Sequence, residues 1–496
     1  MRILGKNSDE FLILARPIDN IVSGDFLLVE EGKTRALLQV YEENYLDTLG
    51  LVEDIVRDDL IKSSSEGVDI DPIGINSISE TIHDLRILKC KTRGSFMTNS
   101  SVTRGHNIPS RPSSNLRRLT TNQVFELIGR DRSIDFSPGK TRDGEEFYLS
   151  GRDLDGSLNI ITGRKGSGKS HLSKIIASGL AELGASVIVF DLNDEYCGLS
   201  LKRDGQKSDM GNKTKIFVPG DSLKFSLKYL GLRATLSILQ HVLDIPGASL
   251  REFTKIWHRL EETGNLSSIS LGEMIKSWRC NELVRDALLS RFHTINSSGL
   301  LTDNEEQVVR LEDIVNSSDE GRIIIVSMGR VSPLIRRMTV ELILGKLTHL
   351  LEENLIRPLF LFAEEAHLYL RDTYWDDLVT RMRHFGLFPT LITNQPDAID
   401  HSIYRQADNI FLFNFTNDLD LEMISRTSTI DASSVKSMVK TLQRGDCLIL
   451  GKAVQDIPTL IRVPETDIMT MGETKLFFTS NKNNNVGQNI KLPSIG

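Results

Sequence analysis

The chain is poor in cysteine, has no long apolar run and carries no excess of positive charge. Its 496 residues include 4 cysteines, which lie far apart and lack metal-ligand spacing. They are expected to be reduced thiols in a cytoplasmic protein. No apolar stretch reaches the roughly 18 residues that a membrane helix needs, and the first residues lack a secretory apolar region. Neither membrane insertion nor secretion is therefore expected.

The net charge of −8 argues against a protein that coats nucleic acid over its whole surface. The charge is unevenly distributed, however. Residues 1–60 hold thirteen acidic and six basic side chains, whereas residues 85–118 hold eight basic side chains and no acidic one. Serine and proline in this basic stretch are typical of a solvated loop, and its charge is equally typical of a surface that contacts phosphate or a partner. Both interpretations stay open.

Short alternating segments occupy the beginning of the chain. Glu10–Ala15, Asp25–Glu30 and Arg35–Tyr41 each alternate between apolar and polar residues and are separated by turn residues. This pattern predicts a small antiparallel barrel or sandwich. Leu85–Cys90 and Val124–Ile128 could add strands to it or lead into the next domain.

From about residue 147 strands alternate with helices, which predicts an α/β fold with a largely parallel, helix-covered sheet. The predicted core strands are Leu158–Thr162, Ser186–Asp191, Ile323–Ser327, Leu359–Ala363, Thr390–Thr393, Ile410–Phe415 and Cys447–Leu450. Between Ser226 and Asn316 only amphipathic stretches occur, so we expect a helical insertion between the second and third core strands. The Asn-rich end, Ser480–Gly496, is expected to be disordered unless a partner holds it.

The most specific chemical signal is Gly163-Arg-Lys-Gly-Ser-Gly168-Lys169-Ser170, which has the spacing G-x-x-x-x-G-K-S of a phosphate-binding loop. Glycine is needed because backbone N–H groups must curl around an anion, where a Cβ would obstruct the approach. An apolar strand precedes the loop and a helical pattern follows it, so a helix N-terminus would point at the phosphates. A turn that merely joins strand to helix is the alternative. The expected ATP-binding residues are Gly163, Gly166, Ser167, Gly168, Lys169, Ser170 and His171, with Ser170 also on Mg²⁺.

The second half of the site is expected where strand 359–363 ends in Glu364-Glu365-Ala366-His367. A strand that ends in two carboxylates can place Glu364 beside Mg²⁺ and Glu365 beside the attacking water as a general base. The alternative is an exposed acidic helix start, which the helix dipole would favour.

Four further positions complete the candidate site. Gln395 closes a predicted strand and suits a sensor of the γ-phosphate, or else belongs to a polar turn before Pro396. Arg381 is a candidate arginine finger for a neighbouring subunit, or else lies on a solvated helix face. Asp191–Tyr196 could approach the metal or the neighbour, or form a simple turn. Arg142 could reach a phosphate.

Taken in order, a barrel-like N-terminus, the loop at 163–170, Asp191–Tyr196, Glu364–His367, Arg381–Gly386 and Gln395-Pro396 resemble the HerA family. These are hexameric DNA-translocating ATPases related to FtsK and partnered by the NurA nuclease. The resemblance covers nearly the whole chain. It implies that Lys169 and Ser170 bind phosphate and Mg²⁺, Glu364 stands on the metal side, Glu365 is the catalytic base, Arg381 is the finger and Gln395 is the sensor.

Two departures from the family pattern are present. Leu192-Asn193-Asp194 stands where the family commonly has His-Gly, and Lys165 stands where it commonly has Thr. Neither change affects the phosphate-binding backbone, so ATP binding is still expected. The first departure lies in the turn after the second core strand.

The resemblance also implies a domain layout. An N-terminal β-barrel with its extension (1–130) would precede a RecA-like ATPase core in two parts (131–225 and 318–470), with the helical insertion (226–317) between them and a tail (471–496) at the end.

The implied function is that of an ATP-dependent double-stranded DNA translocase or helicase. It would work as a homohexameric ring with a NurA-type nuclease in DNA end resection and repair. The basic candidates for gripping DNA in the channel are Lys202, Arg203, Lys207, Lys213, Arg336 and Arg337. The alternative is a nucleotide-stabilised ring that serves as a scaffold and activates a nuclease or defence effector. A conjugation or secretion ATPase is disfavoured by the absence of expected membrane spans and by the barrel.

Overall fold

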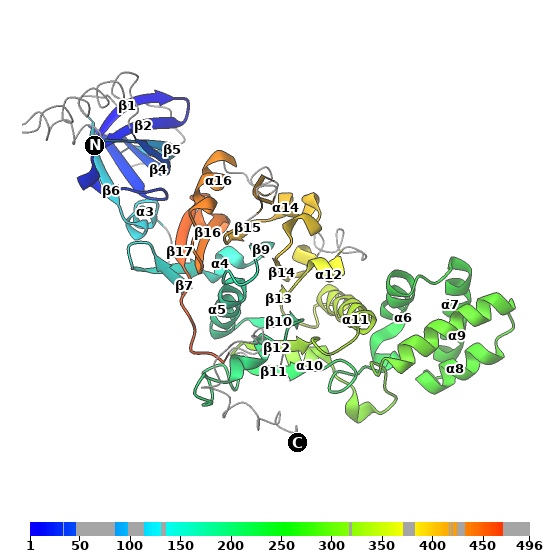
Figure 1. The fold of residues 1–496 in the computed structure, drawn as a ribbon. Coiled ribbons are helices and arrows are strands. Elements are labelled where there is room, and N and C mark those ends of the chain that lie inside the picture. Colours follow the sequence, from blue (N-terminus) through cyan, green and yellow to red (C-terminus); the bar gives the residue numbers. More distant parts are fainter. Residues whose placement is uncertain are drawn as a thin grey trace, which may run out of the picture.

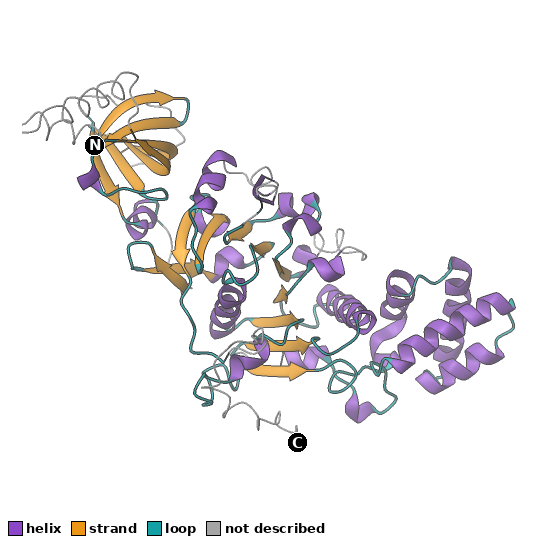
Figure 2. Ribbon diagram, viewed as in Figure 1, coloured by secondary structure: helices purple, strands orange, loops and turns teal. Residues whose placement is uncertain are grey.

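The computed structural model contains two β-sheets and several groups of helices (Figures 1 and 2). It describes residues 1–32, 34–45, 85–97, 114–129, 135–316, 320–370, 382–415, 417, 420–422, 424 and 432–469. The predictions for Arg381 and for the tail from Ser480 onward lie outside these residues. Among the described residues, no helix combines the length and the apolar character that crossing a membrane requires.

The N-terminal sheet has six antiparallel strands in the order β1-β2-β5-β4-β3-β6. The strands are β1 (Arg2–Asn7), β2 (Glu10–Ala15), β3 (Phe26–Glu31), β4 (Thr34–Tyr45), β5 (Arg86–Met97) and β6 (Asn115–Leu119). Alternation decides which side chains are buried: Phe11, Ile13 and Ala15 of β2 face an apolar cluster, while Leu12 between them is exposed. The predicted strands from Glu10 onward are thus confirmed, and closure into a barrel stays a prediction.

The basic stretch forms strands instead of a solvated loop over its described part. Lys89 pairs with Glu42 at 2.9 Å, and Arg86 pairs with Glu43 at 3.0 Å, because β5 lies directly beside β4. Lys91 pairs in the same way with Asp9 at 3.2 Å. These side chains therefore neutralise the acidic N-terminal segment, and a phosphate-contacting role is not needed to account for their charge.

Of the two interpretations left open for Val124–Ile128, the one that adds a strand is wrong. Residues 124–127 belong to helix α3 (Thr121–Leu127), and Ile128 is its C-cap. Thr120 caps this helix, because its hydroxyl accepts the Gln123 N–H while the Gln123 side chain accepts the Thr120 N–H. This Thr-x-x-Gln capping box is a helix-start signal that outweighs the β-propensity of Val124 and Phe125.

The core sheet has eleven strands in the order β11-β12-β10-β13-β14-β9-β15-β16-β17-β7-β8. The parallel part contains β9 (Asn159–Thr162), β10 (Ser186–Asp191), β11 (Thr214–Phe217), β12 (Arg322–Ser327), β13 (Leu359–Ala363), β14 (Leu387–Thr393) and β15 (Asn409–Leu412). The antiparallel extension contains β16 (Asp446–Gly451), β17 (Thr459–Arg462), β7 (Asp135–Thr141) and β8 (Glu146–Ser150). All seven predicted core strands are present, and their bounds differ by at most a few residues.

Helices cover the two faces of the core sheet. Alternate residues of each strand enter different apolar clusters: Ile161 packs with the helix α5 (Lys169–Glu182), whereas Ile160 packs with the helix α11 (Pro333–Glu352). Strands buried on both faces read as continuous apolar runs, which is why the sequence revealed them. The remaining described elements are η1 (Pro17–Asp19), α4 (Gly151–Leu154), η2 (Tyr196–Ser200), η4 (Glu305–Gln307), α12 (His367–Leu370), η5 (Pro396–Ala398), α14 (His401–Gln406), α16 (Ala432–Lys440) and η6 (Lys452–Val454).

A group of helices lies at the end of the molecule away from the N-terminal sheet (Figure 1). It contains α6 (Leu227–Ser237), the π-helix η3 (Ile238–Val242), α7 (Gly247–Glu262), α8 (Ser268–Ser277) and α9 (Glu282–Ser297). The short helix α10 (Leu311–Val315) follows in the chain and lies beside β11 and β12 of the core sheet (Figure 1). In α7, Phe253, Trp257 and Leu260 recur at helical spacing and are buried. The unpredicted strand β11 precedes this group, so the helices follow the third core strand along the chain and not the second.

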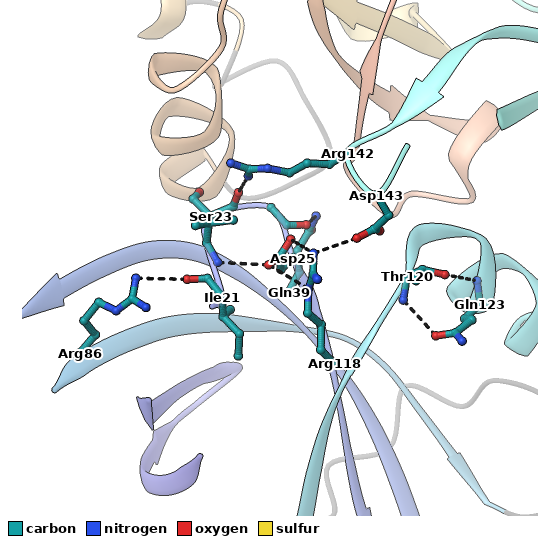
Figure 3. Close-up of polar contacts among 12 residues, drawn as sticks. Ile21, Ser23, Asp25, Gln39, Arg86, Arg118, Thr120, Gln123, Arg142 and Asp143 are labelled. Atoms are coloured by element: carbon teal, nitrogen blue, oxygen red, sulfur yellow. Dashed lines mark hydrogen bonds and ion pairs between the residues drawn. The ribbon is translucent and has the colours of Figure 1, made fainter. Parts of the chain in front are cut away.

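The N-terminal sheet contacts the antiparallel end of the core through a polar junction (Figure 3). Arg118 of β6 bridges two acids: Nε donates to Asp25 at 3.1 Å, and Nη2 donates to Asp143 of the core at 2.9 Å. The buried Gln39 amide donates to the Pro458 carbonyl at 2.7 Å. An apolar cluster lies beside these contacts and contains Phe26, Leu28, Leu37, Leu119, Val124 and Ile457. Hydrogen bonds and apolar packing therefore both hold the N-terminal sheet against the core.

Replacing Asp25 by alanine is expected to loosen this junction. The Asp25 side chain is only 5% exposed and accepts hydrogen bonds from Arg118 and from the Val22 N–H. Its loss should cost about 2–3 kcal/mol, because the Arg118 guanidinium and the Val22 N–H both lose a charged acceptor. Hydrogen exchange at the amides of β3 and β4 should accelerate by about tenfold to a hundredfold.

Asp9→Ala is the matched control. Like Asp25, Asp9 forms an ion pair, in its case with Lys91. Its side chain is 57% exposed, so its replacement should lower the free energy of unfolding by less than about 1 kcal/mol. Equal acceleration of exchange in the two variants would contradict the role given to Asp25.

Candidate active site at the carboxyl ends of the parallel strands

The glycine-rich loop joins β9 to α5 and has the backbone that the motif demands. Gly163, Gly166 and Gly168 have φ values of 150°, 75° and 123°. A Cβ on Gly163 would lie 2.6 Å from the Cβ of Phe413, and one on Gly168 would lie 3.0 Å from the same ring. Gly163 and Gly168 are therefore required both by their conformation and by the close approach of Phe413, whereas Gly166 is required by its conformation alone.

Neighbouring segments hold the loop in place. The Arg164 N–H donates to the Asn414 carbonyl at 3.0 Å, and the Gly445 N–H donates to the Ser167 carbonyl at 3.0 Å. Gly445 in turn accepts the Val463 N–H at 2.9 Å. The loop is thus anchored to the segments that follow β15 and precede β16.

Lys169 is the first residue of α5 and is buried, with 8% of its surface exposed. Its ammonium donates to the carbonyls of Gly163 at 2.8 Å and of Arg164 at 3.0 Å. Burial lowers the pKa of Lys169, and the charges of Glu365, Glu195 and Glu364 counteract this effect. The loop therefore holds a cation close to three carboxylates that come from other strand ends.

The carboxylates at 364 and 365 follow β13 as predicted. Glu364 is 2% exposed, and burial together with Glu195 and Asp191 raises its pKa well above the usual range. Burial also raises the pKa of Glu365, while the Lys169 charge lowers it. The alternative of an exposed acidic helix start is wrong for Glu364, because the strand end places it inside the protein.

Glu365 has an unusual backbone. Its φ is 47°, a left-handed conformation that costs a residue with a side chain of the order of 1 kcal/mol. The Ala366 N–H donates to Ile392 of β14 at 3.0 Å, and the Leu368 N–H donates to the Glu365 carbonyl at 2.8 Å. The neighbouring strand thus helps to fix the direction in which Glu365 points.

The end of β14 supplies the amide beside Glu365. The Asn394 Nδ2 donates to Glu365 Oε1 at 3.3 Å, whereas the side chain of Gln395 is exposed. Asn394 is therefore an amide at this strand end that the sequence analysis did not single out, and the sensor role of Gln395 stays a prediction. Which of two consecutive amides faces inward depends on the turn into Pro396, whose geometry the residue types do not reveal.

The segment after β10 forms a tight turn around Asp191. This buried carboxylate accepts the N–H groups of Asn193, Glu195 and Tyr196 at 3.3, 3.0 and 2.8 Å. Burial raises its pKa to about 6 despite these bonds. Asp194, with φ 58°, accepts the Ser327 hydroxyl at 2.5 Å. These contacts favour the turn interpretation, in which Asp191 organises the backbone.

Three other candidates occupy different surroundings. Arg142 lies in the turn after β7 and donates to the Ser23 carbonyl at 2.6 Å (Figure 3). The phosphate contact predicted for it is not made within one subunit, because β7 is four strands from β9, a separation of about 19 Å. His171 is in the first turn of α5, and burial together with Lys174 lowers its pKa, which favours a neutral imidazole over a phosphate-binding cation. Arg381 lies outside the described residues.

The basic residues expected to grip DNA are partly engaged within the chain. Lys213 donates to the Glu320 carbonyl at 2.9 Å, and Arg336 donates to the Met328 carbonyl at 3.3 Å. Arg203 lies 3.8 Å from Glu465 but remains half exposed. Their contacts with DNA stay a prediction.

Comparison with known proteins supports this assignment of the core. Residues 156–347 match the family model "Helicase HerA, central domain". The chain is 22% identical over 366 residues to the DNA double-strand break repair helicase HerA of Saccharolobus solfataricus, covering 67% of this chain and 70% of that protein.

Solved structures share the fold. VirB4 of Thermoanaerobacter pseudethanolicus has a TM-score of 0.52 and 15% identity, and the match covers 68% of this chain and 98% of that chain. The plasmid coupling protein TrwB in complex with ADP and Mg²⁺ has a TM-score of 0.50 and 12% identity over 71% of this chain and 94% of that chain. The predicted resemblance is confirmed: residues 156–347 match the HerA central domain, and the chain is an ATP-hydrolysing enzyme with a P-loop.

Proposed function

We propose that this protein is a motor that uses ATP hydrolysis to move double-stranded DNA through a homohexameric ring, with a NurA-type nuclease as its partner in DNA end resection and repair. The observation that carries the proposal is the meeting of Lys169 and Glu365 at one edge of the sheet, although 195 residues separate them in the chain. The match to the HerA central domain supports DNA as the substrate of the motor. A cytoplasmic location is part of the same proposal.

The chemistry of the site fits a nucleotide with Mg²⁺. The loop offers backbone N–H groups that no Cβ obstructs, and the buried Lys169 supplies a positive charge for phosphate. Burial and the nearby charges of Glu195 and Asp191 raise the pKa of Glu364, and a divalent cation would offset this repulsion. Ser170 and Glu364 offer the oxygen ligands that Mg²⁺ prefers. When bound, Mg²⁺ would neutralise charge on the β- and γ-phosphates.

The remaining steps belong to the protein's own side chains. Glu365 accepts the proton of the attacking water. Its pKa is raised toward neutral pH, and a general base is most effective when its pKa lies near the working pH. Asn394 holds Oε1 of Glu365, and Oε2, which accepts no hydrogen bond from the described residues, is the oxygen proposed to take the proton of the water. Arg381 of a neighbouring subunit completes the site as an arginine finger, with Gln395 as a sensor at the exposed strand end.

The proposed domains follow the same division. Residues 1–130 form the N-terminal barrel-type domain, 131–225 and 318–470 form the ATPase core, and 226–317 form a helical insertion, with 471–496 as a tail. The order of the described sheets and helices supports this layout.

Duplex DNA is expected to accelerate ATP hydrolysis several-fold, because a motor couples turnover to movement along its track. The measurement compares the ATPase rate with and without duplex DNA, on protein whose mass in solution has been determined. An oligomer that hydrolyses ATP at the same rate in both conditions would instead favour the alternative function, a nucleotide-stabilised scaffold that activates a nuclease or defence effector.

Mixing two inactive variants should restore activity if the finger acts between subunits. Arg381→Ala subunits keep Lys169, and Lys169→Ala subunits keep Arg381. In a random equal mixture about a quarter of the sites would have both groups, so up to about a quarter of wild-type activity is expected. Each variant alone is the control, and a mixture no more active than either one would rule out a finger in trans.

A further inference from the structure

A buried histidine lies between the base and the end of β14. His367 begins α12 and is 9% exposed. Its Nδ1 lies 3.1 Å from the hydroxyl oxygen of Thr393 and 3.5 Å from Oε2 of Glu365. Thr393 is the last residue of β14 and is fully buried. A single ring nitrogen therefore faces both the carboxylate and the strand end.

The hydrogen bonds of Thr393 decide which partner carries the proton. The Thr393 hydroxyl accepts the Gln395 N–H at 3.0 Å and lies 3.1 Å from the Gln395 carbonyl, to which it donates. A hydroxyl has one proton, so the contact with His367 must use the proton on Nδ1. The same tautomer suits Glu365, because a bare lone pair on Nδ1 would repel the carboxylate.

We propose that His367 is a positioning residue for hydrolysis, which uses its Nδ1–H to hold Glu365 and to tie it to Thr393 at the end of β14. This inference rests on the proposed function, in which Glu365 is the base. Two groups then face the carboxylate from the side of β14. Asn394 donates a hydrogen bond to Oε1, and the Nδ1–H of His367, which is hydrogen-bonded to Thr393, lies near Oε2 at 3.5 Å and attracts it electrostatically.

The arrangement has a consequence for the γ-phosphate end of the site. Thr393, Asn394 and Gln395 are consecutive in the chain. Thr393 contacts His367, and Asn394 contacts Glu365 directly. A displacement of this strand end therefore changes the orientation of the base. His367 couples the residues proposed as the sensor to the residue proposed to activate water.

The test compares replacements of His367 that differ in the donor. Asparagine places an N–H near the position of Nδ1, whereas phenylalanine keeps a ring without any donor. His367→Phe should lower kcat by about tenfold to a hundredfold, because the hydrogen bond to Thr393 and the N–H beside the Glu365 carboxylate are both lost, while the Kd for ATP changes less than about threefold. His367→Asn should keep kcat within about fivefold of wild type. His258→Phe, an exposed histidine on α7, is the control.

A double-mutant cycle completes the experiment. Thr393→Val keeps the shape of the side chain and removes the hydroxyl, so it should lower kcat in the same way. The double variant with His367→Phe should be no slower than the slower single variant, because both act through one chain of contacts. Equal rates for the Asn and Phe variants, or strictly multiplicative losses in the double variant, would overturn the proposal. A wild-type chain without ATPase activity, or an active Glu365→Gln variant, would instead overturn the proposed function.

Discussion

Glu365→Gln is expected to lower the ATPase rate by about a thousandfold while ATP remains bound. The amide keeps the size of the side chain and can still accept the Asn394 hydrogen bond, but it cannot take a proton from water. Loss of the general base and of the negative charge beside the attacking water together account for this magnitude. Single-turnover hydrolysis and the Kd of a fluorescent ATP analogue are the measurements.

The control for Glu365 is Glu353→Gln, an exposed glutamate at the end of α11. It should hydrolyse ATP at the wild-type rate. A Glu365→Gln variant that retains more than about a tenth of the wild-type rate would show that another carboxylate is the base. The candidates are then Glu195 and Glu364, whose charges interact with that of Glu365.

Lys169→Ala is expected to abolish ATP turnover by weakening binding itself. The Lys169 ammonium is held by the carbonyls of the loop, and its removal takes one positive charge away from the acidic groups around it. We expect a loss of about a hundredfold in ATP affinity and of about a thousandfold in the rate at saturating ATP. Equilibrium binding and steady-state hydrolysis separate the two effects.

Lys228→Ala is the matched control, since Lys228 is an exposed lysine on α6, away from the loop. Thermal unfolding of both variants distinguishes a lost site from a lost fold. Unchanged turnover in a folded Lys169→Ala protein would refute the assignment of the loop.

Much of the core could be read from the sequence because its signals are local. The loop at 163–170 has a strand before it and a helix after it, and both flanks are present. The strand that ends in Glu364 is likewise buried on both faces and therefore continuously apolar. Chemistry that depends on the end of such a strand can be located from sequence alone.

The remaining features depend on contacts between distant segments. Arg86 and Lys89 look like a loop or a binding surface until β5 is paired with β4, which brings their acidic partners alongside. Arg142 looks like a phosphate ligand until the strand order places β7 beyond β17. Helix α3 is a different case. The sequence contains its Thr-x-x-Gln capping box, and this signal outweighs the β-propensity of Val124 and Phe125.

The β16–β17 hairpin connects the loop at 163–170 with the N-terminal sheet. At one end Gly445 is bonded to the phosphate loop, and at the other end Pro458 receives the hydrogen bond of Gln39 from the N-terminal sheet. The six residues of β16 make this ribbon about 20 Å long. A rotation of about 5° at the loop would therefore carry the far end through about 2 Å. The β16–β17 hairpin would therefore carry a movement of the loop at 163–170 to the N-terminal sheet.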